Sequence, residues 1–265
     1  MSKVIILGCG AAPGVPSVAD GFGDCDPNNP KNIRLRSGTY VELGSTKFLI
    51  DTSTDLRMQL ILSNIRDIDA VFYTHPHSDH LHGIDDLREI NRIHNKSIEL
   101  FASDDCLGYI KTRFPYLLVE SDKDINPIYR AALHPNNFVY EESFYFKDVK
   151  VTPIKLIGHN LETAGYIFND GEIVYIADCK QIPESAFSLI KRQPELLIMP
   201  LTTPAGTRYH MGLTDLLNYA KRINAKRTVI NHMAIESDYE QVKSQCFTGV
   251  EPAYDGLEIK WNIEE

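Results

Sequence analysis

Residues 74–83, which read THPHSDHLHG, constrain this chain more than any other part of it. They follow the apolar residues 70–73, which we interpret as a buried strand. His75 and His77 are two positions apart, so in an extended chain their side chains point the same way and suit one metal ion. Asp79 and His80 are adjacent and point differently, which suits a second ion beside the first. Imidazole and carboxylate together are ligands for zinc, iron or manganese, so the run predicts a metal site at the end of a strand.

The composition excludes several other classes of protein. Of the 265 residues, 43% are hydrophobic, which is enough for a large core without disulfides. The net charge of −9 argues against broad, non-specific binding of nucleic acid, which needs a basic face. No apolar run is long enough to span a membrane, and residues 4–7 are too few for the core of a signal peptide. The five cysteines are odd in number and include no CxxC pair, so we expect a reducing, cytoplasmic compartment.

Predicted strands and helices alternate along the chain in two similar halves, with no linker between them. The predicted strands cover 4–7, 39–43, 47–50, 70–73, 99–102, 144–146, 149–156, 164–168, 173–177, 196–199 and 228–231, and the predicted helices cover 56–64, 84–94, 103–114, 184–192 and 214–224. We expect one α/β domain over residues 1–265, with sheets inside and helices outside. Residues 8–32, rich in Gly, Pro, Asn and Asp, predict a long loop, and the poorly patterned residues 115–137 receive no assignment.

The HxHxDH pattern from His75 to His80 resembles that of the metallo-β-lactamase-fold hydrolases. The resemblance implies a four-layer αββα sandwich with a site for two metal ions at one edge, between the two sheets. Each remaining ligand of that family has a counterpart here at the end of a later apolar stretch. The implied ligands are His75, His77 and His159 for one ion, Asp79, His80 and His232 for the other, and Asp178 as a bridge.

Shorter motifs between residue 4 and about residue 235 are similar to the PhnP branch of that superfamily. They are GCG at 8–10, GVP at 14–16, CDP at 25–27, KNIR at 31–34, HGIDDLR at 82–88 and RFPY at 113–116. The branch is named for a cyclic-phosphate phosphodiesterase and is related to the tRNA 3′-processing endonucleases. The resemblance implies that the loop 8–32 borders the active site and that His210 belongs to it. The branch also carries several cysteines for a structural zinc in this loop. Only Cys9 and Cys25 are present here, so we do not expect that zinc.

These observations predict a metal-dependent phosphodiesterase that cleaves a small cyclic or nucleotide-like phosphodiester. Two divalent ions, zinc or manganese, can lower the pKa of a shared water toward about 7 and supply hydroxide. We expect Asp79 to ligate a metal and orient that nucleophile. His210 is expected to donate a proton to the leaving alkoxide, or only to fix the geometry of the site. His82 is a candidate either to contact substrate or to brace the site from behind.

Three other functions remain open at this point. The same metal core serves thioester and lactone hydrolysis, which makes a small acyl substrate the first alternative. A tRNA 3′-processing endonuclease is the second, although the chain has no insertion for an extended basic arm and its net charge is acidic. A non-catalytic accessory protein is the third, and the complete ligand set argues against it. We expect a small-molecule partner, no extended nucleic-acid surface and no membrane. The sequence leaves open a homodimer, the native metal and the natural substrate.

Overall fold

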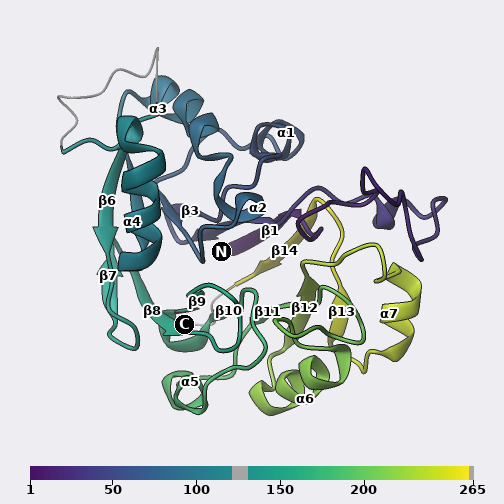
Figure 1. The fold of residues 1–265 in the computed structure, drawn as a ribbon. Coiled ribbons are helices and arrows are strands. Elements are labelled where there is room, and N and C mark those ends of the chain that lie inside the picture. The colour runs from purple at the N-terminus through teal and green to yellow at the C-terminus, as the bar shows by residue number, and fades with distance from the viewer. Residues whose placement is uncertain (121–130, 263–265) are drawn as a thin grey trace.

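The computed structural model describes residues 1–120 and 131–262 (Figure 1). Within these residues the strands form two seven-stranded sheets. The first sheet has the order β14 (Leu257–Trp261), β1 (Ser2–Gly8), β2 (Gly38–Leu43), β3 (Thr46–Ile50), β4 (Ala70–Phe72), β5 (Ile98–Ala102) and β6 (Leu133–Asn137). The second has the order β13 (Val250–Pro252), β12 (Arg227–Asn231), β11 (Leu196–Pro200), β10 (Ile173–Tyr175), β9 (Ala164–Phe168), β8 (Val149–Lys155) and β7 (Phe144–Phe146).

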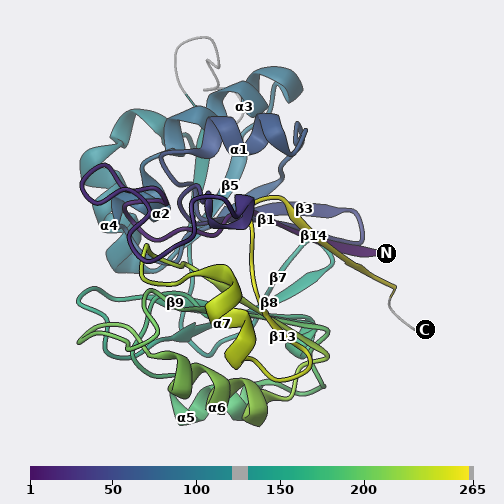
Figure 2. The same cartoon turned by 90° about the vertical axis from the view of Figure 1, so that its right-hand side faces the viewer.

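Helices cover the outer face of each sheet, as Figure 2 shows. The helices on the first sheet are α1 (Leu56–Leu62), α2 (Ser78–Leu81), α3 (Arg88–His94) and α4 (Asp104–Arg113). Those on the second are α5 (Glu184–Leu189), α6 (Leu213–Ile223) and α7 (Tyr239–Gln245). Short 3₁₀ turns are η1 (Pro30–Asn32), η2 (Ile84–Leu87), η3 (Pro115–Leu117) and η5 (Asn169–Gly171). The order helix, sheet, sheet, helix confirms the predicted four-layer αββα sandwich. Among the described helices, none has the length and hydrophobicity to cross a lipid bilayer.

The strand β1 illustrates why the sequence contains continuous apolar runs. Its Val4 and Ile6 lie in the core between the two sheets. Its Ile5 and Leu7, on the opposite face, lie in the core between the first sheet and its helices. Side chains alternate between the two faces of a strand, so a strand covered on both faces is apolar at every position.

Aromatic side chains from both sheets pack together in the inter-sheet core. The Phe72 ring at the end of β4 lies 4.8 Å from Phe101 of the same sheet. The same ring lies 5.5 Å from Tyr166 and 5.7 Å from Phe168, which belong to β9 of the second sheet. Edge-to-face contacts of this kind stabilise a core by about 1 kcal/mol each beyond the burial of their area. The strand that leads to His75 is therefore anchored to the opposite sheet.

Most predicted elements are present with shifted ends, but two predicted helices are wrong in extent. The predicted helix over 84–94 begins as the 3₁₀ turn η2, and the α-helix starts only at Arg88. The predicted helix over 184–192 ends at Leu189, because Ile190 is extended and the Lys191 N–H donates to the Asp170 carbonyl. The predicted strand over 173–177 likewise ends at Tyr175.

Several elements carry no sequence prediction. They are α2, β6, α7, β13 and β14. Of the unassigned residues 115–137, the structure places η3 and β6, and 121–130 lie outside the described residues. The predicted loop over 8–32 is held in place along its length. Val15 and Arg34 exchange two backbone hydrogen bonds, and the Ala11 N–H donates to the Met233 carbonyl. The loop is thus fastened beside the segment that follows β12.

Candidate metal centre

The first group of predicted ligands is delivered by the end of β4. After Phe72 the chain stays extended, and the Thr74 N–H donates to Asp51 Oδ1 at 2.8 Å. His77 lies immediately before α2, and Asp79 and His80 lie on this helix. Because the strand runs straight into a helix, the motif changes direction between His77 and Asp79. His77 therefore joins a candidate ligand group with His75 and His159, and Asp79 joins another with His80 and His232.

The second group comes from the ends of strands in the other sheet. His159 follows β8, Asp178 follows β10, and His232 follows β12 directly. The carboxyl ends of β10, β11 and β12 meet at one edge because these strands are parallel. His232 has a φ of 58°, in the left-handed region that histidine enters more readily than most residues.

The structure brings all seven predicted ligands, and His210, into four overlapping groups whose ligand atoms lie within 4.8 Å of one another. The groups are His75, His77 and His159; His75, His80 and Asp178; Asp79, His80 and His232; and His159, Asp178 and His210. Asp178 belongs to two of these groups, as do His75, His80 and His159, and it is the one carboxylate among these four residues. The resemblance implies that it bridges the two ions.

The separations between ligand atoms fit a coordination sphere. His75 Nε2 lies 3.0 Å from His77 Nδ1, and His232 Nε2 lies 3.3 Å from Asp79 Oδ2. His80 Nε2 lies 3.3 Å from Asp79 Oδ2. Ligand atoms that each lie 2.0–2.1 Å from a tetrahedral zinc ion are about 3.4 Å apart. The side chains are therefore already at the spacing that such an ion requires.

The Nδ1 atoms of five rings have oxygen partners that fix their orientation. A threonine hydroxyl faces Nδ1 in His75, His159, His210 and His232, at distances between 2.9 and 3.2 Å. In His80 the partner is the Asp51 carboxylate, at 2.7 Å. These partners leave each Nε2 atom turned toward the cluster, as histidine ligands are usually held. His77 is the exception, because it turns Nδ1 toward His75.

Two buried atoms in the cluster have no hydrogen-bond partner among the described residues. They are His80 Nε2 and Asp178 Oδ1. Leaving a buried polar atom unpaired costs about 1–3 kcal/mol, so such atoms call for an explanation. A divalent ion would satisfy both, and the residues present therefore fit the two-metal site that the resemblance implies.

The electrostatic environment favours neutral rings at His75 and His159 and ionised carboxylates at Asp79 and Asp178. Burial lowers the pKa of His75 well below its ordinary value and that of His159 to about 4. Burial opposes ionisation of Asp79 and Asp178, but neighbouring His80 and His232 outweigh it and hold both pKa values below the usual range. Burial also disfavours charge on His80, yet the carboxylates of Asp79 and Asp51 raise its pKa. The cluster is thus built for positive charge at its centre.

A cavity of about 380 Å³ opens onto this cluster. Its lining contains His77, Asp79, His159, Asp178, His210 and His232, whereas His75 and His80 are buried behind it. Ala11, Ala12 and Pro13 form part of the wall, so the loop 8–32 borders the cavity. Asn160, Thr203, Tyr209 and Glu236 line the rest with Thr202 and Ala234. No Lys or Arg is among these described lining residues.

His82 and His210 occupy different surroundings. His210 lines the cavity, with Nε2 3.5 Å from Asp178 Oδ2. His82 is exposed at the end of α2, with Nε2 3.1 Å from the Tyr109 hydroxyl and its ring 5.5 Å from the Phe114 ring. It is not among the described residues that line the cavity. Its contacts tie α2 to α4.

Sequence reasoning missed Asp51, which holds His80 directly and His75 through Thr74. Asp51 Oδ2 accepts hydrogen bonds from both His80 Nδ1 and Thr74 Oγ1. The sequence did contain a signal for Asp51, because this residue follows an apolar strand directly, as His75 nearly does.

The cysteines do not contribute to the metal cluster. No candidate metal group among the described residues includes a cysteine, and burial raises the pKa of the Cys179 thiol.

Comparison with known proteins identifies a family and several similar chains. A family model described as the beta-lactamase superfamily domain matches residues 46–233. An octanoyltransferase of Porphyromonas gingivalis is 26% identical over 97% of this chain and 51% of its own length. The chain therefore spans about half the length of this curated relative.

Two solved structures share the whole architecture. A diphosphatase of the PhnP family is 27% identical, with a TM-score of 0.87 over 99% of both chains. Zinc-bound PqqB of Methylobacterium extorquens is 20% identical, with a TM-score of 0.73 over 98% of this chain and 100% of its own. At 20% identity, the similarity to PqqB shows a shared fold alone.

Proposed function

The chain belongs to the beta-lactamase superfamily, and we propose that it is a metal-dependent hydrolase of a small phosphodiester. The observation that carries the proposal is the double ligand set at the bottom of one cavity. His75, His77 and His159 would hold one ion; Asp79, His80 and His232 would hold the other, with Asp178 between them. Zinc and manganese both suit this mixture of imidazole and carboxylate.

The chemistry that two divalent ions supply is a lowered pKa for a shared water and stabilisation of charge on a phosphoryl group. Asp79 is held in its ionised form by His80 and His232, whose Nε2 atoms both lie 3.3 Å from Asp79 Oδ2. A carboxylate that cannot take up a proton at neutral pH can only accept hydrogen bonds. Asp79 therefore orients the attacking water and directs its lone pair toward the substrate.

His210 is positioned to serve the leaving group. The Thr207 hydroxyl lies within hydrogen-bond distance of His210 Nδ1, at 3.1 Å, so Nε2 is the ring nitrogen that faces the cavity. Asp178 Oδ2 lies 3.5 Å from that Nε2 atom. A proton delivered from Nε2 to the departing oxygen would spare the formation of a free alkoxide, an effect typically worth 10²–10⁴-fold in rate.

The size and charge of the cavity support a small substrate of low negative charge. A volume of about 380 Å³ accommodates a nucleotide-sized molecule rather than a folded RNA. The described lining contains three carboxylates, those of Asp79, Asp178 and Glu236, and no cationic side chain. A phosphodiester carries one negative charge and suits this lining better than a phosphomonoester, which carries about two.

A second candidate substrate is a diphosphate. It is favoured by the likeness to the PhnP-family diphosphatase, which is the more similar of the two solved structures described above. Hydrolysis of a phosphoanhydride needs the same ligand set and the same attacking water. Its leaving group is a phosphate of low pKa, so it depends less on a proton from His210.

The test is turnover by the chain purified with zinc or manganese. We expect hydrolysis of bis(p-nitrophenyl) phosphate and of a cyclic nucleotide or a dinucleoside diphosphate. His77→Ala should abolish turnover, whereas His134→Ala, which changes an imidazole outside the cluster, should leave it unchanged. A panel of S-lactoylglutathione, an acyl-homoserine lactone and an octanoyl thioester covers the acyl alternatives. Hydrolysis of an acyl substrate with none of the phosphorus compounds would overturn the proposal.

A further inference from the structure

The hydroxyl group of Thr207 lies at the centre of the turn that carries His210. Its Oγ1 atom accepts hydrogen bonds from the Tyr209 N–H at 3.1 Å and from the His210 N–H at 3.0 Å. The same Oγ1 atom lies 3.1 Å from His210 Nδ1. A hydroxyl group has two lone pairs and one proton. Because the two N–H groups take the lone pairs, only the Thr207 proton remains for Nδ1.

The direction of this third hydrogen bond decides where a neutral His210 ring carries its own proton. A neutral imidazole has one N–H group and one bare nitrogen. When Nδ1 accepts from Thr207, the ring proton has to lie on Nε2, the nitrogen that faces the cavity. Asp178 Oδ2, 3.5 Å from Nε2, is a complementary partner, because an ionised carboxylate only accepts hydrogen bonds. His210 thus presents an N–H group to the cavity, and no lone pair.

The threonines behind two of the proposed metal ligands are bonded in the opposite sense. Thr74 Oγ1 donates to Asp51 Oδ2 at 2.8 Å, so it has only lone pairs for His75 Nδ1, which lies 2.9 Å away. Thr163 Oγ1 donates to the backbone carbonyl two positions before it, at 3.3 Å, and lies 3.1 Å from His159 Nδ1. In both rings Nδ1 therefore carries the proton, and Nε2 keeps the lone pair that a metal ion requires.

The turn around Thr207 is held firmly enough to maintain this geometry. The Thr207 N–H donates to the His210 carbonyl at 3.0 Å. Lys180 Nζ donates to the carbonyls of these same two residues, at 3.0 Å and 3.2 Å. Gly206 has a φ of 71°, and a β-carbon on it would lie 2.7 Å from the backbone nitrogen of Gly212. The chain itself therefore places the Thr207 hydroxyl against the His210 ring.

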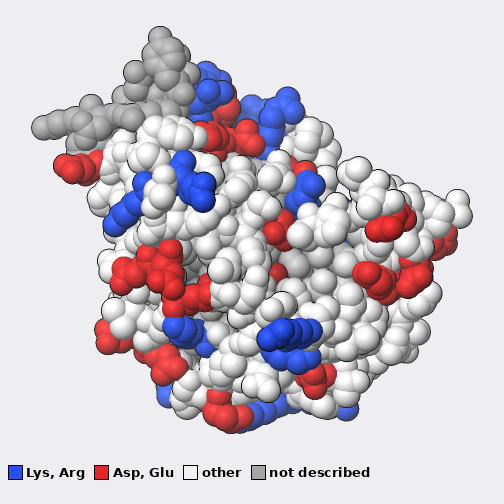
Figure 3. Space-filling model, viewed as in Figure 1, with Lys and Arg blue, Asp and Glu red and all other residues white. Residues whose placement is uncertain are grey.

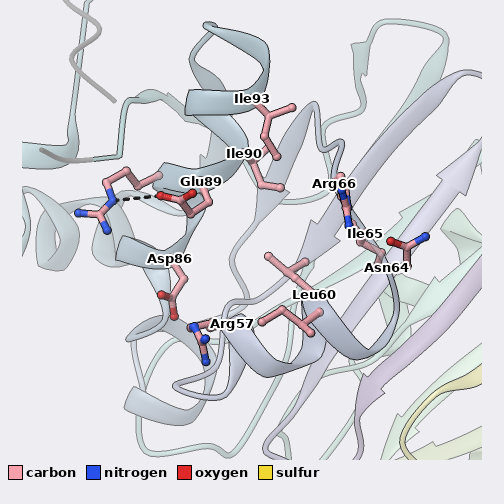
Figure 4. Close-up of a pocket in the computed structure, with 11 residues that line it drawn as sticks. Arg57, Leu60, Asn64, Ile65, Arg66, Asp86, Glu89, Ile90 and Ile93 are labelled. Carbon is pink, nitrogen blue, oxygen red and sulfur yellow. Dashed lines mark ion pairs between the residues drawn. The ribbon is translucent and has the colours of Figure 1, made fainter. Parts of the chain in front are cut away.

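The rest of the cavity offers no basic side chain that could replace this N–H group. Its described lining contains no Lys or Arg. Acidic and basic side chains are mixed over the face of the molecule shown in Figure 3, with no extended basic patch. The groove between α1 and the segment of η2 and α3, about 530 Å³ in volume, is a separate site (Figure 4). Its described lining contains no histidine and shares no residue with the cavity.

We propose that Thr207 is a positioning residue, which donates to Nδ1 and thereby keeps the neutral His210 ring protonated on Nε2. His210 is then a hydrogen-bond donor in the cavity and not a metal ligand, although its ligand atoms lie close enough to those of His159 and Asp178 to form a candidate group. The inference rests on the proposed function for the use of that proton, which is directed to the leaving oxygen. A partner on the far nitrogen is the usual device that fixes the tautomer of a functional histidine.

Nuclear magnetic resonance of the whole chain, labelled with ¹⁵N in its histidines and loaded with metal, tests the assignment. The resonances of His210 are those that disappear in His210→Ala. At about pH 8, well above the ordinary pKa of histidine, they should show a proton on Nε2 and none on Nδ1. With ¹¹³Cd in place of zinc, neither nitrogen of His210 should couple to the metal. A proton on Nδ1, or a coupling of Nε2 to cadmium, would overturn the proposal.

Two substitutions at Thr207 isolate the effect of the hydroxyl group. Thr207→Val should give a mixture of both tautomers and lower kcat about tenfold on a diester with an alkoxide leaving group, with unchanged KM and zinc content. Thr207→Ser should restore the tautomer and bring kcat within about twofold of the wild type. Thr112→Val is the matched control, because it removes a hydroxyl that donates to the Gly108 carbonyl on α4. It should change neither measurement.

The resonance measurement needs no turnover, so this inference and the proposed function can fail separately. If His210 shows the expected tautomer but the chain hydrolyses no phosphorus compound, the proposed function is wrong and the assignment of Thr207 stands. The wild-type spectrum decides the tautomer even if Thr207→Val does not fold. A folded Thr207→Val chain with the wild-type tautomer would overturn the role of Thr207. A Thr207→Ser chain that behaves like Thr207→Val would do the same.

Discussion

The Asp51 carboxylate lies 2.7 Å from His80 Nδ1 and also accepts the hydroxyl proton of Thr74 at 2.8 Å. A single buried side chain thus orients one proposed ligand directly and a second, His75, through the Thr74 hydroxyl. Asp51 adopts a φ of 64°, a left-handed conformation in which its carboxylate turns back toward Thr74. A residue placed in this way controls which nitrogen of each ring faces the metal cluster.

Asp51→Asn should weaken zinc binding by about 10–100-fold. With the amide oxygen on the Thr74 N–H, the amide NH₂ faces His80 Nδ1 and donates to it. The His80 proton then moves to Nε2, the atom that has to bind the metal. Zinc affinity measured by competition with a chromophoric chelator would report the loss. Asp67→Asn, which changes an exposed ion pair with Lys47, is the control. Equal affinity in the two variants would contradict the role of Asp51.

His210→Ala should separate proton donation from positioning. Against a diester with an alkoxide leaving group, kcat should fall by about 10²–10⁴-fold, because the departing oxygen no longer receives a proton. Against bis(p-nitrophenyl) phosphate the loss should be only a few-fold, since p-nitrophenolate leaves without one. The comparison requires steady-state kinetics on both substrates. Equal losses would show that His210 only shapes the site.

Metal removal should destabilise the folded chain, since a ligand that binds only the native state adds to its stability. An ion present at 100 times its dissociation constant contributes about 2.7 kcal/mol, which for a domain of this size is about 5 °C or more in Tm. Chelator-treated protein should therefore melt at lower temperature and recover on addition of zinc. Thermal scans of wild type and His77→Ala would check this. If zinc raised the Tm of His77→Ala as much as that of the wild type, His77 would not be a zinc ligand.

Asp69→Asn should lower stability at neutral pH and not in acid. The Asp69 carboxylate lies 3.1 Å from Lys96 Nζ and 2.7 Å from Lys147 Nζ, which precedes β8 of the second sheet. Burial opposes its ionisation, but the hydrogen bonds from Lys147 and the Lys47 N–H outweigh it and hold its pKa below the ordinary value.

The sign of the pH dependence follows from that lowered pKa. The folded state binds fewer protons than the unfolded state, so the stabilisation is complete above about pH 4 and is lost as the pH falls through the folded-state value. Urea unfolding should give a difference of about 1 kcal/mol between wild type and Asp69→Asn from pH 8 to pH 5. The difference should shrink below pH 4. A difference that persists at pH 3 would point to packing instead of charge.

Much of the metal cluster was predictable because its ligands follow a rule that the sequence displays. Each proposed ligand lies close behind an apolar strand, and His75, His77 and His80 lie within six residues. What could not be predicted is the set of threonine hydroxyls behind the rings. Thr163 and Thr202 resemble any other threonine in the sequence, and only the folded chain brings them to His159 and His232.

The C-terminal part of the fold shows a different limit. The strand β14 pairs with β1, so that Val4 lies opposite Ile259 at the far end of the chain. Nothing local in either segment specifies that partner. A local signal did exist for α7, where the Asp238 side chain accepts from the Gln241 N–H and begins the helix. The sequence did not predict which face of α1 is exposed, because the same spacing of Leu and Ile describes a helix buried on either side.

The inter-sheet core has a consequence for the metal cluster. His75 to His80 belong to one sheet and His159, Asp178 and His232 to the other, so the cluster straddles the seam between two stacked layers. Tyr166 crosses that seam by donating its hydroxyl proton to the Tyr73 carbonyl. The thickness of the aromatic packing around Phe72 therefore sets the distance between the proposed metal ligands of one sheet and those of the other. A substitution in this packing would change the separation of the two sheets. It would thereby alter the geometry of the proposed metal ligands without touching any of them.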